Sequence, residues 1–172
     1  MQSVYQAIQN GADAVYFAGK NFGARAFAAN FTYDEMKQAI DYAHLYGAKA
    51  YITLNTLVYE NEISEFLKHA ERVYKLGADA LIMQDIGMMS LLYNRFPDTH
   101  IHASTQSHNH SDESLYFVRE LGASRAVLAR EMDIAQIKSL ECDIEKEAFI
   151  HGALCICYSG QCLMSSIIGG RS

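Results

Sequence analysis

The sequence predicts an α/β protein whose parallel strands belong to a TIM-like (β/α)8 barrel, and three observations support this prediction. A short apolar stretch introduced by Gly-Ala recurs along the chain at residues 11–17, 47–54, 77–83 and 122–128. These stretches are continuously apolar, as in strands covered on both faces of a sheet, rather than alternating as in half-exposed strands. Segments with helical spacing of apolar residues lie between them, and strict alternation of helix and strand is typical of a parallel sheet.

The predicted elements follow one another in a regular order. A helix over residues 2–10 leads to the first Gly-Ala strand, and the glycine of each repeat suits the left-handed residue just past a helix. Thr32 and Glu35 have the spacing of a capping box, which predicts a helix over about 33–46. A further amphipathic helix is expected over about 62–76. Shorter helices are expected near 87–95, 111–121 and 132–140, and two further strands around 100–104 and 146–151.

A barrel is favoured over a doubly wound sheet because no Gly-x-Gly-x-x-Gly turn follows the first strand. A complete barrel needs eight strands and about 250 residues, whereas this chain of 172 residues supplies about six strands. The chain also starts within a helix, with no strand before it. We therefore expect residues 1–172 to form one partial barrel that lacks its first strand and its C-terminal part. Open strand edges invite pairing, so we expect such a fragment to self-associate through them.

The composition is that of a globular protein rather than of a disordered, collagen-like or coiled-coil chain. Hydrophobic residues make up 50% and charged residues 20%, which allows a sizeable core. The formal net charge of −6 argues against sequence-independent binding of nucleic acid, although it does not exclude a local RNA site. No apolar run approaches the roughly 18 to 20 residues of a membrane span, and no signal peptide is evident. We therefore expect a cytoplasmic protein with no membrane partner.

Polar or ionisable residues follow the expected strands, at the end where barrel enzymes place their active sites. Asp85 and Glu131 could act as acid or base, or could instead serve as a helix cap and an ion-pair partner. Arg25 and Arg130 suit a carboxylate or phosphate ligand because guanidinium groups bind such anions in a bidentate way. A structural ion pair with Asp85 or Glu131 is the alternative for both arginines. The candidate catalytic residues are Arg25, Asn55, Asp85, Gln106, Arg130, Glu131 and His151.

Three of the four cysteines fall close together near the end of the chain, a spacing that favours metal binding or chemistry over disulfides. Cys155 and Cys162, on a glycine-containing loop, can bind one soft metal centre. Cys157 could join them or could be buried as an apolar residue, whereas Cys142 precedes the last expected strand. A Cys155 nucleophile with His151 as its base is the alternative chemistry.

Four of the seven histidines lie in His100-Ile-His102 and His108-Asn-His110. Zinc sites use such spacings. The first pair begins an expected strand, however, and the second lies past its far end, a separation of roughly 20 Å for six extended residues. We therefore expect no zinc site here.

The cysteine segment also forms a long motif. Residues 147–165 read Glu-x-Phe-x-x-Gly-Ala-Leu-Cys-x4-Gly-x-Cys-x-Met-Ser. Shorter motifs extend along the chain, namely Asn10-Gly-Ala-Asp-Ala-Val-Tyr16, Arg25-Ala, Asn30-Phe31, Leu54-Asn55-Thr56, Gln84-Asp85, Ser104-Thr-Gln106 and Ala129-Arg-Glu131. On these motifs the chain resembles the collagenase-like peptidases of peptidase family U32.

This resemblance implies a barrel that begins one strand earlier and a four-cysteine 4Fe-4S cluster in the full-length protein. Cys155 and Cys162 correspond to the first two cluster ligands, and the other two ligands would lie downstream of residue 172. Cys157 does not correspond to a ligand position of the family. We expect the fragment by itself to hold no intact cluster and to be inactive.

The family resemblance allows two activities. Some members are described as collagen-degrading proteases, and others are linked to hydroxylation of uridine in transfer RNA, of cytidine in ribosomal RNA, or in ubiquinone synthesis. The second group is favoured because the chain has no Gly-x-Ser-x-Gly or His-Glu-x-x-His motif. In addition, Arg25 and Arg130 suit RNA phosphate or an anionic cofactor such as prephenate, which is implicated in the family.

Our interpretation is an Fe–S-dependent RNA hydroxylation protein that acts on tRNA. A collagenase-like peptidase acting on a peptide substrate is the alternative, and a non-catalytic scaffold barrel is the third hypothesis.

Overall fold

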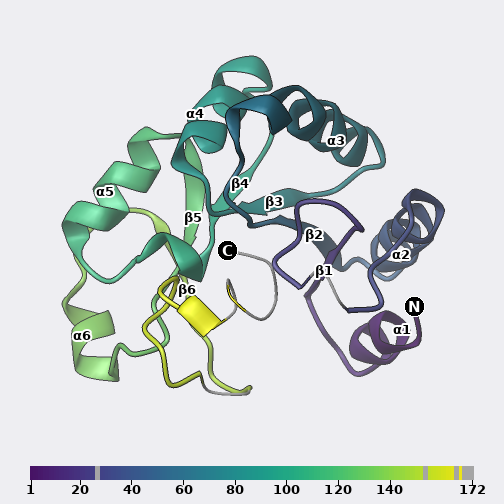
Figure 1. Cartoon of the computed structure of the whole chain (residues 1–172). Helices are drawn as coiled ribbons and strands as arrows, with labels where there is room; N and C mark the ends of the chain where they lie inside the picture. The colour runs from purple at the N-terminus through teal and green to yellow at the C-terminus, as the bar shows by residue number, and fades with distance from the viewer. Residues whose placement is uncertain (26–27, 153–154, 165–166, 168–172) are drawn as a thin grey trace. The chain divides into compact units, whose positions relative to one another are not determined.

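The computed structural model describes residues 1–25, 28–152, 155–164 and 167. Within these residues the strands form one sheet, and their order in it follows the chain, β1-β2-β3-β4-β5-β6. Helices connect the strands (Figure 1). This arrangement confirms the predicted α/β class with parallel strands. None of the described helices is long and apolar enough to cross a membrane. The chain divides into two compact units, Met1–Ile82 and Met83–Ser172.

The first unit is built on the parallel pair β1–β2. The strands pair from Ala14↔Lys49 to Ala18↔Thr53, so the residues that follow each strand emerge at the same edge of the sheet. Helix α2 packs on β2, while α1 packs on both β1 and α2. The elements of this unit are α1 (Gln2–Gln9), β1 (Ala14–Ala18), α2 (Tyr33–Leu45), β2 (Lys49–Leu54), the 3-10 turn η1 (Glu60–Glu62), α3 (Ile63–Lys75) and most of β3 (Ala80–Met83).

Helix α2 begins at the capping box that the sequence predicts. The Thr32 hydroxyl accepts a hydrogen bond from the Glu35 N–H at 3.3 Å, and the Glu35 carboxylate accepts from the Thr32 N–H at 2.8 Å. Two of the free N–H groups at the helix start are thereby satisfied. One face of α2 is buried. Its residues are Met36, Ala39, Ile40 and Ala43.

A left-handed glycine follows the helix in each of the four Gly-Ala repeats, as predicted. Gly11, Gly47, Gly77 and Gly122 have φ values between 73° and 99°, a region that side chains disfavour. Gly122 has a second constraint, because a Cβ there would lie 2.3 Å from the Cγ atom of Tyr93.

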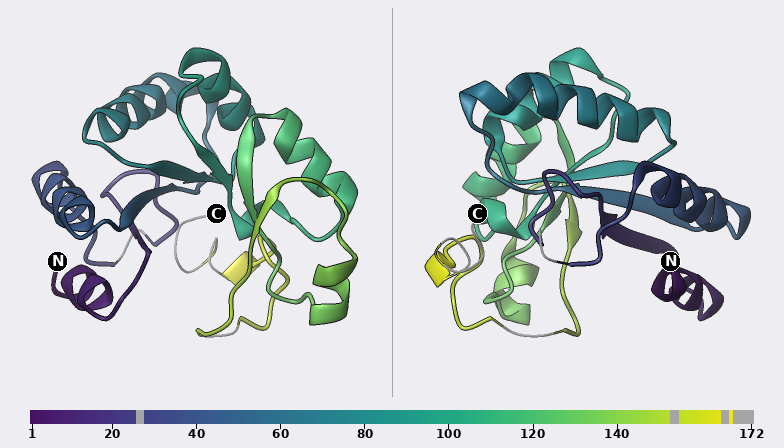
Figure 2. Two further views of the ribbon diagram at one scale, coloured as in Figure 1. Left: turned by 180° about the vertical axis from the view of Figure 1, so that it is seen from behind. Right: turned by 45° about the vertical axis from the view of Figure 1, so that its right-hand side comes forward.

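The second unit is built around β5, which pairs in parallel with β4 and with β6. Helix α5 packs on β5, and Figure 2 shows the two elements side by side. Its elements are α4 (Ile86–Arg95), β4 (Ile101–Ala103), the 3-10 turn η2 (Thr105–Ser107), α5 (Asp112–Glu120), β5 (Ala123–Val127), α6 (Ile134–Ser139) and β6 (Glu145–Glu147).

The last strand ends earlier than the predicted stretch of about 146–151. The Glu147 carbonyl accepts a hydrogen bond from the Leu128 N–H at 2.8 Å, but the next N–H on this side of the chain, that of Arg130, bonds to Ser159 Oγ at 3.2 Å. Because Ser159 takes this donor, the β5–β6 ladder does not continue. Residues 148–152, which follow β6, are exposed.

Candidate metal centre

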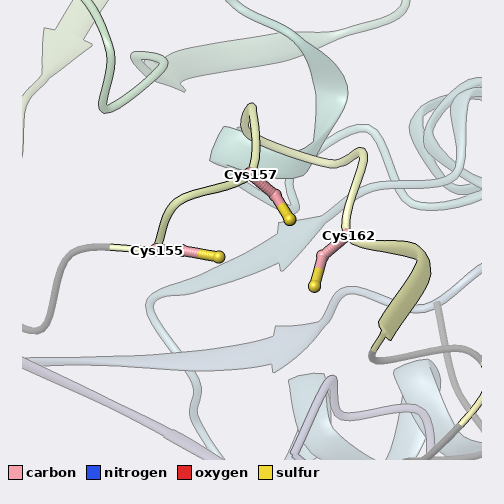
Figure 3. Close-up of side chains that lie close together, drawn as sticks. All are labelled: Cys155, Cys157 and Cys162. Carbon is pink, nitrogen blue, oxygen red and sulfur yellow. The ribbon is translucent and has the colours of Figure 1, made fainter.

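Three cysteine side chains come together in the second unit. The Sγ atoms of Cys155, Cys157 and Cys162 all lie within 4.8 Å of one another, and Figure 3 shows them around a common space. Cys155 is exposed, and the other two are partly buried. Thiolates this close together suit a soft metal ion or an iron–sulfur cluster. The site offers three thiol ligands, one more than the family resemblance implies.

The neighbouring thiols affect the protonation of Cys157. The pKa of Cys157 is raised, first by its hydrogen bond with the Cys162 side chain and further by burial and by Cys155. A metal ion would favour the deprotonated form of such a group, because metal binding by thiols releases their protons. The chemistry of the donor set therefore fits a cationic occupant.

Residues 155–162, here called the cysteine loop, are attached to the end of β5 through one side chain. Ser159 is buried, with 0% of its surface exposed. Its hydroxyl donates to Glu131 Oε2 at 2.8 Å, and its N–H lies 3.2 and 3.3 Å from the two carboxylate oxygens. The backbone N–H and Nε of Arg130 donate to Ser159 Oγ at 3.2 and 3.4 Å. Two successive residues after β5 thus bind the same serine.

The end of β4 contributes to the same contact. The Thr105 hydroxyl lies 3.3 Å from Ser159 Oγ and donates to the Leu128 carbonyl at 2.9 Å. Ser159 is therefore held by residues that follow two neighbouring strands.

The loop also approaches the backbone of η2 very closely at Gly160. This residue has a φ of 78°, and a Cβ on it would lie 2.3 Å from the Gln106 carbonyl oxygen. The side-chain Nε2 of the next residue, Gln161, lies 3.1 Å from His108 Nε2. Only glycine fits the conformation and the space at position 160.

The hydrogen bonds of the loop favour an ionised Glu131. Burial opposes ionisation, but the hydrogen bonds from Ser159 and the positive charge of Arg130 outweigh it, so the pKa of Glu131 is lowered. The carboxylate is therefore the stable form near neutral pH.

The predicted site residues of the second unit lie in three different settings. Gln106, Arg130 and Glu131 contact the cysteine loop at Ser159 or Gly160. Asp85 caps α4, accepting a hydrogen bond from the Met88 N–H at 3.0 Å, which is the structural alternative considered for it. His151 is exposed, four residues beyond the end of β6.

The predicted site residues of the first unit shape the segment after β1. Asn55 Oδ1 accepts a hydrogen bond from the Ala24 N–H at 2.9 Å. The side chain of Arg25 is exposed, and its carbonyl accepts from the Asn30 side chain at 2.9 Å. Both of these hydrogen bonds thus involve the backbone of this segment.

A different arginine forms an ion-pair cluster in the second unit. Arg125 on β5 pairs with Glu145 at 2.7 Å and with Glu147 at 3.2 Å, both on β6. Glu147, the first residue of the long motif, therefore helps to hold β6 against β5.

Sequence reasoning missed Ser159 and left Cys157 open. Ser159 gave no signal because its partners Glu131 and Thr105 lie 28 and 54 residues away along the chain. For Cys157 the available signal was its spacing of two residues from Cys155. Three residues of the long motif, Ala153, Leu154 and Ser165, lie outside the described residues.

Helices alternating with parallel strands, and a thiol site at the carboxyl ends of two of them, define an α/β protein of the TIM-barrel type with a candidate metal centre. The chain belongs to peptidase family U32, whose model matches residues 1–172.

Relatives of the chain carry two kinds of name. It is 42% identical over 169 residues to the 23S rRNA 5-hydroxycytidine C2501 synthase of Escherichia coli, covering 97% of this chain and 25% of that protein. It is 36% identical to tRNA hydroxylation protein P of Haemophilus influenzae, covering 99% and 38%. It is 31% identical to a collagenase of Porphyromonas gingivalis, covering 95% and 42%. The chain thus spans between a quarter and about two fifths of the length of these relatives.

Solved structures support the fold. The U32 peptidase Mk0906, of TIM-barrel type, matches with a TM-score of 0.66 at 12% identity, over 80% of this chain and 60% of that one. DHDPS from Cyanidioschyzon merolae matches with a TM-score of 0.50 at 16% identity, over 81% and 52%.

Proposed function

We propose that this chain is the cluster-binding barrel portion of a protein that hydroxylates RNA, with tRNA as the preferred substrate. The observation that carries the proposal is the group of three thiols within 4.8 Å, on a loop attached to the strand ends. Active sites of barrel enzymes lie at these strand ends. The names of relatives at 42% and 36% identity, an rRNA hydroxycytidine synthase and a tRNA hydroxylation protein, give the reaction class.

The proposed cofactor is a 4Fe-4S cluster. Cys155 and Cys162 are its ligands, Cys157 supplies a third thiolate in this chain, and the remaining ligand comes from outside the cysteine loop. The donor set fits, because thiolates are the usual ligands of such clusters. When bound, the cluster would supply one-electron redox chemistry.

The proposed binding of the anionic substrate or cofactor uses the arginines. Arg130 Nε donates to Ser159, which orients the guanidinium plane beside the cysteine loop. A guanidinium held in this way suits an RNA phosphate or the carboxylates of prephenate. Arg25, exposed in the first unit, is the second candidate for such an anion. Among the other candidate catalytic residues, Asn55, Asp85 and Gln106 would order the loops around the substrate, and His151 would transfer protons.

Iron and sulfide analysis of the full-length protein, purified without oxygen, tests the cofactor. We expect about four irons per chain and a visible cluster absorption. Cys155→Ser and Cys162→Ser should lose most of the iron, whereas the matched control Cys142→Ser, altered at a buried thiol outside the group, should keep it. For the activity, tRNA and 23S rRNA from cells lacking the gene should each be analysed for loss of a nucleoside carrying one extra oxygen.

The peptidase alternative is supported by the collagenase relative at 31% identity. A full-length protein that is free of iron, leaves all RNA nucleosides unchanged and cleaves collagen peptides would contradict the proposal. Loss of that cleavage in Cys155→Ser would then identify this thiol as the nucleophile.

A further inference from the structure

The cysteine loop has one fully buried residue, Ser159, within a stretch whose other residues are exposed or partly buried. Ile156 and Tyr158 are exposed by 102% and 71%, whereas Ser159 is exposed by 0%. Apolar burial of these neighbours therefore contributes little to the position of the loop. Among the described contacts of the loop, those of Ser159 are the most numerous.

We infer that the Ser159–Glu131 contact is a positioning device that assembles the three thiols before any metal binds. The inference rests on the proposed function only for the identity of the metal. It assigns Ser159 and Glu131 as positioning residues, which act through Cys157 and Cys162 on either side of Ser159.

The hydrogen bonds of this contact are numerous and strong enough for the role. Glu131 receives both the hydroxyl and the N–H of Ser159, and hydrogen bonds to a charged acceptor are about twice as strong as neutral ones. Arg130 donates to the same hydroxyl oxygen from its backbone, so Ser159 Oγ is both donor and acceptor. The serine is thus fixed in position and in orientation.

The close approach at Gly160 adds a second restraint to the same loop. Because this residue lies against the Gln106 carbonyl, the chain next to Ser159 cannot shift toward η2. Cys157 lies two residues before the fixed serine and Cys162 three residues after it. A loop ordered in this way binds metal without first having to lose conformational freedom.

Titration of the metal-free full-length protein with Co²⁺ tests the inference. Ser159→Ala removes one hydroxyl, and Glu131→Gln keeps the side-chain shape while removing its charge. Removing such outer-shell partners typically weakens metal binding by about 10- to 100-fold, and we expect at least about tenfold for each variant. The Co²⁺–thiolate absorption of the fraction that still binds should also shift, which a general loss of stability would not produce.

Matched controls are present in the same unit. Ser124→Ala loses a hydroxyl that donates to the Ile101 carbonyl, and Glu145→Gln loses a carboxylate that pairs with Arg125. Both should bind Co²⁺ within about twofold of the unaltered protein. The double variant Ser159→Ala/Glu131→Gln should bind Co²⁺ only slightly more weakly than either single variant, because the two changes break the same contact.

A second measurement separates this inference from the proposed function. In the metal-free protein, hydrogen exchange of residues 155–162 should be slow, and it should become faster in Ser159→Ala and Glu131→Gln but not in the controls. An iron-free protein with this pattern would refute the proposed cofactor and support the inference. Fast exchange of the loop in the unaltered protein, or Co²⁺ binding unchanged in both variants, would overturn the inference even if the cluster is present.

Discussion

In the first unit, the polar side chains that follow the strands fold back on a neighbouring backbone: Asn55 accepts from the Ala24 N–H, and Asn30 donates to the Arg25 carbonyl. In the second unit, Glu131 instead reaches Ser159, in a loop that carries three thiols. The two units share the same pattern of polar residues after apolar strands. What distinguishes them is the chemistry of the segment that these residues hold. Polarity at a strand end thus marks loop attachment in both units, and a candidate site in the second.

The largest effect that would sharpen this comparison is expected from Gly160→Ala. The new Cβ would lie 2.3 Å from the Gln106 carbonyl oxygen, at a φ of 78°. Backbone strain of this kind costs of order 1–3 kcal/mol, and here the loop would move away to relieve the clash as well. We expect most of the iron to be lost from the full-length protein, as measured by iron analysis.

The control for this change is Gly47→Ala in the first unit. Its φ is 73°, but a Cβ there would meet nothing within 4 Å. It should lower the melting temperature slightly and leave the iron content unchanged. Equal iron loss in both variants would show that strain, rather than the close approach at Gly160, is responsible.

A second prediction concerns acid sensitivity in the first unit. His69 on α3 is buried, 2.6 Å from the Tyr33 hydroxyl, and burial together with the charge of Arg72 lowers its pKa to about 4. The unfolded chain takes up this proton at about pH 6.5, whereas the folded protein resists it. The contribution of the neutral His69 to the free energy of unfolding should therefore be fully present above about pH 6.5. It should fall as the pH drops toward 4.

Thermal unfolding followed by circular dichroism between pH 7 and pH 4.5 measures this dependence. His69→Gln should flatten it, because the variant has no buried imidazole to protonate. His44→Gln, at an exposed histidine 2.8 Å from Asp79, is the matched control and should keep most of the acid sensitivity. A dependence that is the same in His69→Gln and in the unaltered protein would contradict the assignment.

The smallest effect is expected from Asn55→Ala. It removes the acceptor of the Ala24 N–H, but this group is only partly buried and water can replace the acceptor, so we expect a loss of about 0.5–1.5 kcal/mol. Hydrogen exchange in the segment after β1 should become faster, while the iron content should stay the same. Loss of iron in this variant would show that Asn55 belongs to the metal centre, and the contrast between the two units would fail.

Much of the fold followed from local patterns in the sequence. The capping box of Thr32 and Glu35 and the left-handed glycines, such as Gly47, depend on residues within one helical turn, so their spacing is visible in the sequence. The end of the last strand was not visible. It depends on Ser159, whose hydroxyl oxygen takes the Arg130 N–H that the ladder would need, a contact across 29 residues.

The sequence by itself determined the order and type of the elements, the parallel sheet and the two cysteines of the family motif, because periodicity and short spacing encode them. Only the tertiary structure decided that Cys157 joins Cys155 and Cys162, and that Ser159 rather than Cys157 is the buried residue of the loop. The physical reason is that Ser159 loses its water only where Glu131 can replace those hydrogen bonds. That meeting depends on how the chain folds between two residues 28 positions apart.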